Sequence, residues 1–222
     1  MSDFGVVSLT VRTAILAAIL ITPFGIAIAW LLARKQWPGK SIIETIVALP
    51  LVMPPVATGL ILLKTFGRRG PIGAPLHALG FDIVFTWRAI VIAMAVMSFP
   101  LLVRASRIAF EEVPLRLEQI ARTLGAAPMR VFFTVTLPLA KRGVIGGILL
   151  AFARSLGEFG ATILVAGNIP GRTTTVATSI YNSVQLGQDA DAYRLLLFAV
   201  VVAFVAVWSA EAVNRQRQRL RT

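Results

Sequence analysis

The stretch LEQIARTLGAAPMRVFFTVTLP, residues 117–138, is a polar and basic interruption between two strongly apolar segments. Pro114 suits the first turn of a helix, and apolar residues then recur at helical spacing. Gly125 is placed to adopt the left-handed conformation that ends many helices. We therefore predict a short amphipathic helix over 114–125, and a second short segment that ends at Leu137-Pro138, where the next apolar run begins.

Two interpretations fit this amphipathic helix: it rests on the lipid surface, or it lies in a groove of a soluble partner. Its apolar face consists of Leu117, Ile120 or Ala121, and Leu124. Its predicted polar face consists of Arg116, Glu118, Gln119, Arg122 and Thr123. In a largely apolar protein, such an interruption indicates a docking surface for a soluble partner.

The composition is that of a membrane protein. Hydrophobic residues make up 57% of the 222 residues and charged residues 14%, whereas soluble domains carry about 25% charged residues. Five stretches approach the ~20 residues needed to cross a bilayer: 11–33, 42–63, 87–105, 143–163 and 195–213. We expect one domain over 1–222, an all-α polytopic bundle. The polar stretch 168–193 cannot cross alone, and 176–186 is predicted to form a re-entrant or interfacial helix.

The net charge of +12 suggests an anionic membrane face and not nucleic acid, because of how the charges are distributed. If the first short loop faces the cytoplasm, 14 of the 22 basic residues lie on that side, including Arg215, Arg217, Arg219 and Arg221 of the tail. The positive-inside rule then places the N-terminus outside and the C-terminus in the cytoplasm. A cleaved signal peptide at 11–33 is a weaker alternative, because the run is too long and positive charge follows it.

Catalytic motifs are lacking. The chain has no cysteine, and its one histidine, His77, is expected in a solvated loop without ligand partners, so no metal site is predicted. There is no phosphate-binding loop, zinc-binding helix or nucleophile elbow. We therefore predict a non-enzyme without a cofactor of its own.

Two segments are candidates for a pathway or gate. Prolines cluster in the second span, where they must kink or break the helix; such breaks survive where they face protein or a wet cavity. Arg154 and Glu158 lie four residues apart in an apolar run, which indicates either an internal ion pair or a role at the gate. Nearby hydroxyls serve helix packing or contact an anion. The candidate residues are Pro54, Pro55, Ser98, Pro100, Arg154, Ser155, Glu158 and Thr162.

The interruption at 117–138 resembles a cytoplasmic motif of ATP-binding-cassette (ABC) importer membrane subunits, E-A-A-x3-G-x9-I-x-L-P. Gly125 fills the glycine, Val135 the isoleucine position, and Leu137 and Pro138 the end, with the nine-residue spacing intact. Ala121 fills the second alanine, whereas Gln119 and Ile120 depart from the pattern and Glu118 stands one position early. The resemblance implies the type I importer permease fold and a coupling helix seated in a cleft of an ATPase subunit. The implied contact residues are Glu118, Gln119, Ala121, Arg122, Gly125, Val135, Leu137 and Pro138.

A wider likeness, including ARSLGEFGATILVAGNIPG at 153–171, GRRG at 67–70 and WPGK at 37–40, resembles oxyanion importer permeases, most of all those for molybdate. The resemblance implies a homodimer, two ATPase subunits that carry ATP and Mg, and a periplasmic or lipoprotein oxyanion-binding protein. Tungstate, sulfate or thiosulfate remain alternative anions. A secondary transporter or channel without an ATPase, and a membrane scaffold, are the alternatives of other classes; the chain lacks the internal repeat typical of secondary carriers.

Overall fold

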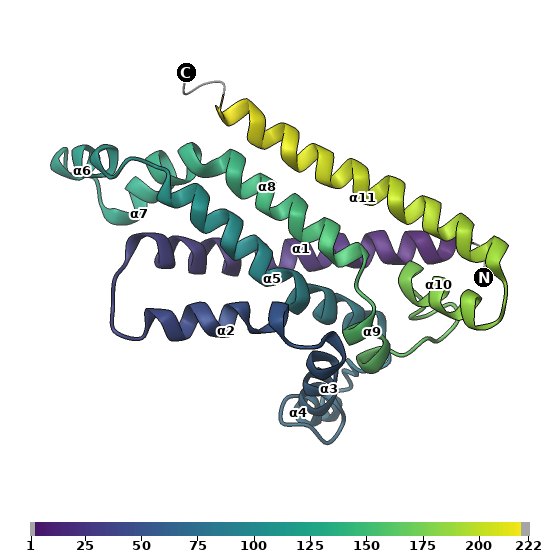
Figure 1. The fold of residues 1–222 in the computed structure, drawn as a ribbon. Helices are drawn as coiled ribbons and strands as arrows, with labels where there is room; N and C mark the ends of the chain where they lie inside the picture. The colour runs from purple at the N-terminus through teal and green to yellow at the C-terminus, as the bar shows by residue number, and fades with distance from the viewer. Residues whose placement is uncertain (1–2, 219–222) are drawn as a thin grey trace.

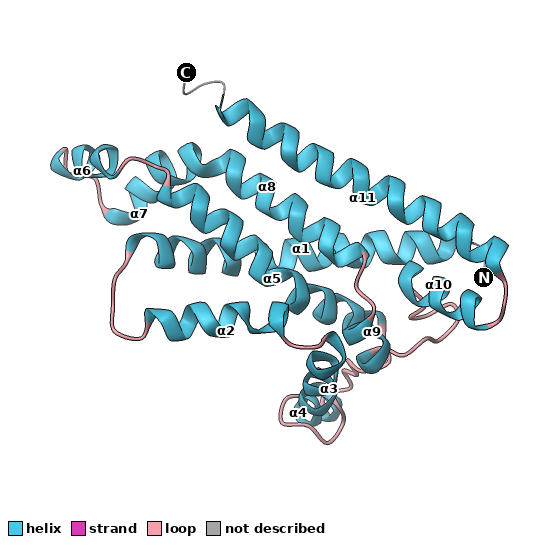
Figure 2. Ribbon diagram, in the orientation of Figure 1, coloured by secondary structure: helices cyan, strands magenta, loops and turns pink. Residues whose placement is uncertain are grey.

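The computed structural model describes residues 3–218, with side chains as far as residue 212, and every regular element in that part of the chain is a helix (Figure 1, Figure 2). The elements are α1 (Asp3–Arg34), α2 (Lys40–Val52), α3 (Pro55–Phe66), α4 (Gly73–Ala78), α5 (Trp87–Glu111), α6 (Leu115–Thr123), α7 (Pro128–Val131), the π-helical turn η1 (Phe132–Thr136), α8 (Leu137–Leu156), α9 (Gly160–Val165), α10 (Val176–Gln185) and α11 (Asp189–Gln218). The basic side chains predicted to anchor the tail, those of Arg215, Arg217, Arg219 and Arg221, lie beyond the last described side chain.

Four helices are long and apolar enough to cross a membrane: α1, α5, the continuous helix Pro128–Leu156, and α11. The pair α2 and α3 passes the same test when taken together. The count agrees with the five predicted spans and confirms an all-α membrane fold. The first and last helices are longer than 11–33 and 195–213, because helical hydrogen bonding continues past the apolar residues that define a span.

The core is formed where α1, α5 and α8 pack side by side (Figure 1). Small residues let these backbones approach closely, as is common in membrane bundles. A Cβ added to Gly25 of α1 would lie 2.6 Å from Leu102 Cδ2 of α5, and one added to Gly147 of α8 would lie 3.0 Å from the Cβ of Ala105. The fourth long helix, α11, packs on α8 and α10.

The second span is broken, as its prolines predict. Between α2 and α3 the chain turns through 109°. Met53 precedes a proline and is extended, with φ −68° and ψ 146°, in agreement with the way a proline ring disfavours the helical conformation of the residue before it. Pro55 then occupies the first turn of α3, where its missing N–H is not needed.

The predicted span 143–163 is wrong at its C-terminal end. The long helix stops at Leu156, and α9 begins only at Gly160. The carboxylate of Glu158 accounts for the break, because its Oε1 accepts a hydrogen bond from the N–H of Ala161 at 2.9 Å. That N–H lies in the first turn of α9, where a helix has no backbone acceptor of its own.

Helix α10 confirms the short helix expected at 176–186. Thr175 caps it through reciprocal hydrogen bonds with Thr178. The N–H of Val176 donates to Oγ1 of Thr10 in α1 at 2.9 Å, which fixes this ten-residue helix against the bundle. Ten residues rise only about 15 Å, so α10 is too short to cross the membrane.

Candidate coupling loop and translocation pathway

Helix α6 turns its apolar residues outward. Leu124 is 82% exposed and Ile120 47% exposed, and Leu115 and Leu117 are exposed as well. The buried residue of α6 is an acid, Glu118, which is 5% exposed. The prediction that Glu118 belongs to the polar surface is therefore wrong. The orientation is the reverse of that expected for a helix packed on its own protein.

A buried ion pair explains why Glu118 points inward. Arg34, the last residue of α1, donates from Nε to Glu118 Oε1 at 2.9 Å, and its Nη2 lies 2.8 Å from the same oxygen. The same Nη2 donates to the carbonyl oxygen of Val113, in the turn before α6, at 2.9 Å. Thr136 of η1 donates its hydroxyl to Glu118 Oε1 at 2.9 Å. We call Arg34, Glu118 and Thr136 the buried clamp; it joins α6 to α1 and to the start of α8.

The π-helical turn η1 follows from Pro138. Proline has no N–H to donate, and its ring clashes with the carbonyl four residues earlier, here that of Thr134. A wider turn relieves this clash and leaves the helix continuous from Pro128 to Leu156. The expectation that a separate segment ends at Leu137-Pro138 is therefore wrong, because the loop runs directly into a spanning helix.

Gly125 ends the α6 region in the left-handed conformation, with φ 83°, as predicted. The N–H of Ala126 donates to the carbonyl oxygen of Ala121 at 3.1 Å, which closes the turn in the manner of a Schellman cap. A Cβ added at Gly125 would meet no atom within 4 Å. Its surroundings within this chain are therefore open.

The other predicted contact residues lie on α6, on η1 and at the start of α8. Gln119, Arg122 and Pro138 are exposed, and Ala121, Val135 and Leu137 are half-buried. Gln119 and Arg122 belong to α6, which lies at one end of the molecule (Figure 1), whereas Pro138 lies at the start of α8.

The charged pair of the predicted gate is an internal ion pair. Arg154 Nη1 lies 3.0 Å from Glu158 Oε2, and the Glu158 side chain is 1% exposed. Because Glu158 also caps α9, its charge is compensated on both oxygens. The pair fixes the junction between α8 and α9.

The candidate hydroxyls separate into two kinds. Ser98 donates to the carbonyl oxygen of Met94 at 2.7 Å and Ser155 to that of Ala151 at 2.9 Å, so both are satisfied within their own helices. The buried hydroxyl of Thr162 has no hydrogen-bond partner within the part of the chain described. Thr162 is thus the candidate hydroxyl that is free to accept or donate.

The proline candidates lie at two different places. Pro54 and Pro55 form the break between α2 and α3, and a Cβ added to Gly160 of α9 would lie 2.7 Å from the Cβ of Pro55. Pro100 of α5 lines a cavity of about 270 Å³ between α2 and α5, together with Arg104. The structure therefore does not gather all the predicted pathway residues into one site.

The comparisons with known proteins identify the family. A family model described as binding-protein-dependent transport system inner membrane component matches residues 12–219. The chain belongs to this family. The molybdenum transport system permease protein ModB of Escherichia coli K12 is 48% identical over 215 residues, which cover 96% of this chain and 94% of the relative. ModB of Haemophilus influenzae is 42% identical over 219 residues, which cover 98% and 96%.

Solved structures agree on the fold of this transport component. A bacterial alginate ABC transporter, in complex with a periplasmic protein bound to an alginate pentasaccharide, matches with a TM-score of 0.70 at 19% identity. The match covers 97% of this chain and 80% of that chain. The fold is that of an ABC importer permease, and the chain is a multi-pass inner membrane protein.

Sequence reasoning assigned Arg34 only to the basic turn after the first span. In this transport component Arg34 holds α6 through Glu118, and its side chain is 7% exposed. The sequence carries one indication of this contact: Arg34 directly follows an apolar run, and the acid Glu118 stands inside a short amphipathic helix.

Proposed function

We propose that this chain is the membrane-spanning subunit of an ATP-driven importer of molybdate, with tungstate as the alternative cargo. The ModB relatives support the cargo, since they match nearly the whole chain at up to 48% identity. The importer permease fold supports the transport class. ATP and Mg belong to a separate ATPase, and this chain contributes no catalytic group.

The observation that carries the proposal is the outward-facing apolar surface of α6. Leucine and isoleucine exposed to water are stabilised when a partner covers them, and an amphipathic helix in a groove is a common way to do so. The buried clamp keeps that surface turned outward because it holds the Glu118 side chain of α6 inside. The loop is therefore built to receive another protein.

The proposed partners follow from the faces left open. Two ATPase subunits would hold the α6 loops of two copies of this chain. The homodimer contact is proposed at helix α2, which has no buried residue and exposes Ile42, Ile46 and Val52. A periplasmic or lipoprotein binding protein would deliver the anion to the opposite end, with the N-terminus outside and the C-terminus in the cytoplasm.

The mechanism is mechanical coupling. Closure of the ATPase dimer would draw the two α6 helices together. Motion of α6 would reach α1 through Arg34, and would reach α8 through Thr136 and the continuous helix behind it. Opening and closing of the spans would then follow the ATP cycle.

The test is uptake of molybdate into proteoliposomes that hold the chain, its ATPase and its binding protein, measured together with ATP hydrolysis. Gly125→Asp should abolish ATP-dependent uptake and leave membrane insertion intact, because it adds a charged side chain to the docking surface. Gly187→Asp is the matched control: Gly187 also has positive φ, 69°, and no atom within 4 Å of an added Cβ, but it lies between α10 and α11.

Two results would overturn the proposal. One is normal ATP-dependent uptake by Gly125→Asp. The other is molybdate uptake by the chain without any ATPase, which would indicate a secondary transporter or a channel.

A further inference from the structure

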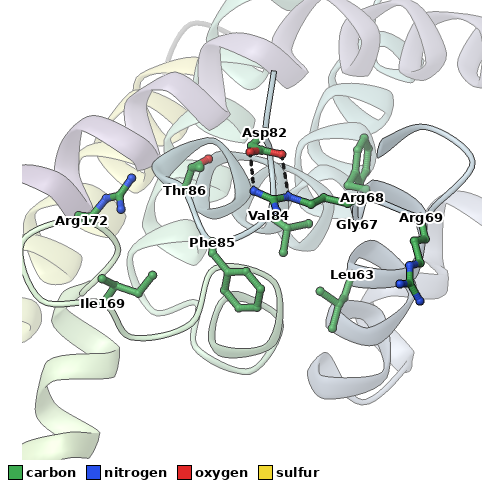
Figure 3. Close-up of a pocket in the computed structure, with 11 residues that line it drawn as sticks. Leu63, Gly67, Arg68, Arg69, Asp82, Val84, Phe85, Thr86, Ile169 and Arg172 are labelled. Atoms are coloured by element: carbon green, nitrogen blue, oxygen red, sulfur yellow. Dashed lines mark hydrogen bonds and ion pairs between the residues drawn. The ribbon is translucent and has the colours of Figure 1, made fainter. Parts of the chain in front are cut away.

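A cavity of about 690 Å³ opens where three loops meet, on the far side of the bundle from α6. One loop follows α3, one precedes α5, and one follows α9. Two of these loops contribute arginines to the lining: Arg68 and Arg69 come from the first loop, and Arg172 comes from the third. Figure 3 shows these side chains around Phe85 and Thr86.

The charges around this cavity are not balanced. Arg68 Nη2 lies 3.0 Å from Asp82 Oδ2, and the guanidinium of Arg68 holds the pKa of that carboxyl below its ordinary value of 3.8. Asp82, which also contacts His77 Nδ1 at 2.9 Å, therefore stays ionised at neutral pH and offsets one arginine. His77 is exposed, as predicted, but it lies in α4 and not in a loop, and it does have this partner.

Arg69 and Arg172 have no acidic partner among the described residues. Three guanidinium groups and one carboxylate leave the cavity with a net charge of +2. Guanidinium groups present fixed forks of N–H donors that suit the oxygens of phosphate-like anions. A doubly charged tetrahedral oxyanion matches both the charge and the donors.

The loop before α5, which also lines the cavity, contains one residue in a strained backbone conformation. Phe85 has φ 60°, a conformation that non-glycine residues rarely adopt, and its N–H donates to the carbonyl oxygen of Val165 in α9 at 3.0 Å. Its ring would lie 3.3 Å from a Cβ added to Gly167. These contacts tie the loop before α5 to the loop after α9, which carries Arg172.

We infer that this basic cavity is a receiving site for a small tetrahedral oxyanion at the face opposite the coupling loop. The inference rests on the proposed function, because that function places this face outside and molybdate as cargo. The positive cavity would raise the local concentration of a dianion released by a binding protein. Recognition would be weak enough for the anion to move on, since all three arginines are exposed.

The first experiment measures molybdate binding by calorimetry at low ionic strength, with the chain in nanodiscs of phosphatidylcholine. The double variant Arg69→Gln/Arg172→Gln should bind molybdate about tenfold more weakly, because it removes both uncompensated charges. Lys64→Gln is the matched control: it removes one positive charge from α3, but Lys64 does not line the cavity. It should change the affinity less than about twofold. Equal affinity of the double variant and the wild type would overturn the inference.

A second arm separates free anion from lipid headgroup, because a phospholipid phosphate has similar oxygens. The measurement is repeated in nanodiscs that contain phosphatidylglycerol. If molybdate binds measurably and phosphatidylglycerol competes with it, the result supports a site for the oxyanion chemistry that molybdate and the lipid phosphate share. If phosphatidylglycerol associates with the wild type and not with the double variant, while molybdate does not bind in either disc, the receiving role is overturned.

Uptake kinetics separate this inference from the proposed function. In proteoliposomes the double variant should raise the KM for molybdate delivered by the binding protein and leave the maximal rate unchanged. Unaltered KM in a working transporter would overturn the receiving site alone. A wild type without ATP-dependent molybdate uptake would overturn the proposed function, and calorimetry would still decide whether the cavity binds the anion.

Discussion

Removing the charge of Glu118 tests the buried clamp directly. Glu118→Gln keeps the shape of the side chain and an oxygen that can accept from Arg34 and Thr136. It leaves the Arg34 guanidinium, which is 7% exposed, without its counter-charge. We expect the variant to insert in the membrane, to be less stable, and to hydrolyse ATP with less uptake for each ATP.

The magnitude follows from the geometry. Removal of one partner from a buried ion pair costs about 3–5 kcal/mol. Arg34 retains its hydrogen bond to the carbonyl of Val113, and Gln retains an acceptor, so the expected loss lies lower, at about 2–3 kcal/mol. Gln119→Ala, at the exposed neighbouring position, should cost about 0.5 kcal/mol or less.

The assay combines equilibrium unfolding in mixed detergent micelles with the ratio of molybdate uptake to ATP hydrolysis. Arg34→Gln alone and the double variant Arg34→Gln/Glu118→Gln complete a double-mutant cycle. The two positions contact each other, so the double variant should lose less stability than the sum of the single losses.

Unchanged stability and an unchanged uptake ratio in Glu118→Gln would refute this reasoning. Strictly additive losses in the cycle would also refute it, since they would show that the two charges do not act on each other.

Three further perturbations address the rest of the bundle. Gly59→Leu should separate α3 from α9 and lower uptake, because a Cβ there would lie 2.8 Å from the carbonyl oxygen of Ala161; Gly157→Ala, whose Cβ meets no atom within 4 Å, should leave uptake unchanged. Arg154→Gln should lower the free energy of unfolding by about 2–4 kcal/mol, because Glu158 would lose its cation; equal stability in detergent unfolding would contradict the ion pair. Thr10→Val should speed hydrogen exchange at the Val176 amide about fivefold, which corresponds to a hydrogen bond worth about 1 kcal/mol; unchanged exchange would count against that contact.

Much of the fold could be predicted, because the bilayer imposes simple rules on sequence. The length of the apolar stretches predicted the spans, the proline cluster predicted the break between α2 and α3, and Gly125 predicted the end of a helix. These features depend on local chemistry, and neighbours along the chain decide them.

The features that could not be predicted depend on partners far away in sequence. Periodicity placed Glu118 on a polar face, but only the end of α1, 84 residues earlier, shows that this face is buried. The end of α8 was missed because hydropathy continues through 157–163, whereas the break depends on a side-chain cap by Glu158. The cavity lined by arginines needs three loops to meet, and no single stretch of sequence indicates that meeting.

On the proposed orientation, a copy of this chain made without an ATPase would leave the exposed leucine and isoleucine residues of α6 uncovered on the cytoplasmic side. Such an apolar surface favours association with other apolar surfaces, including the same surface on a second copy that has no ATPase bound. On the proposed assembly, we expect balanced synthesis of the two subunits to limit aggregation of the permease. An excess of the membrane subunit should be harmful to the cell in a way that an excess of a fully covered membrane protein is not.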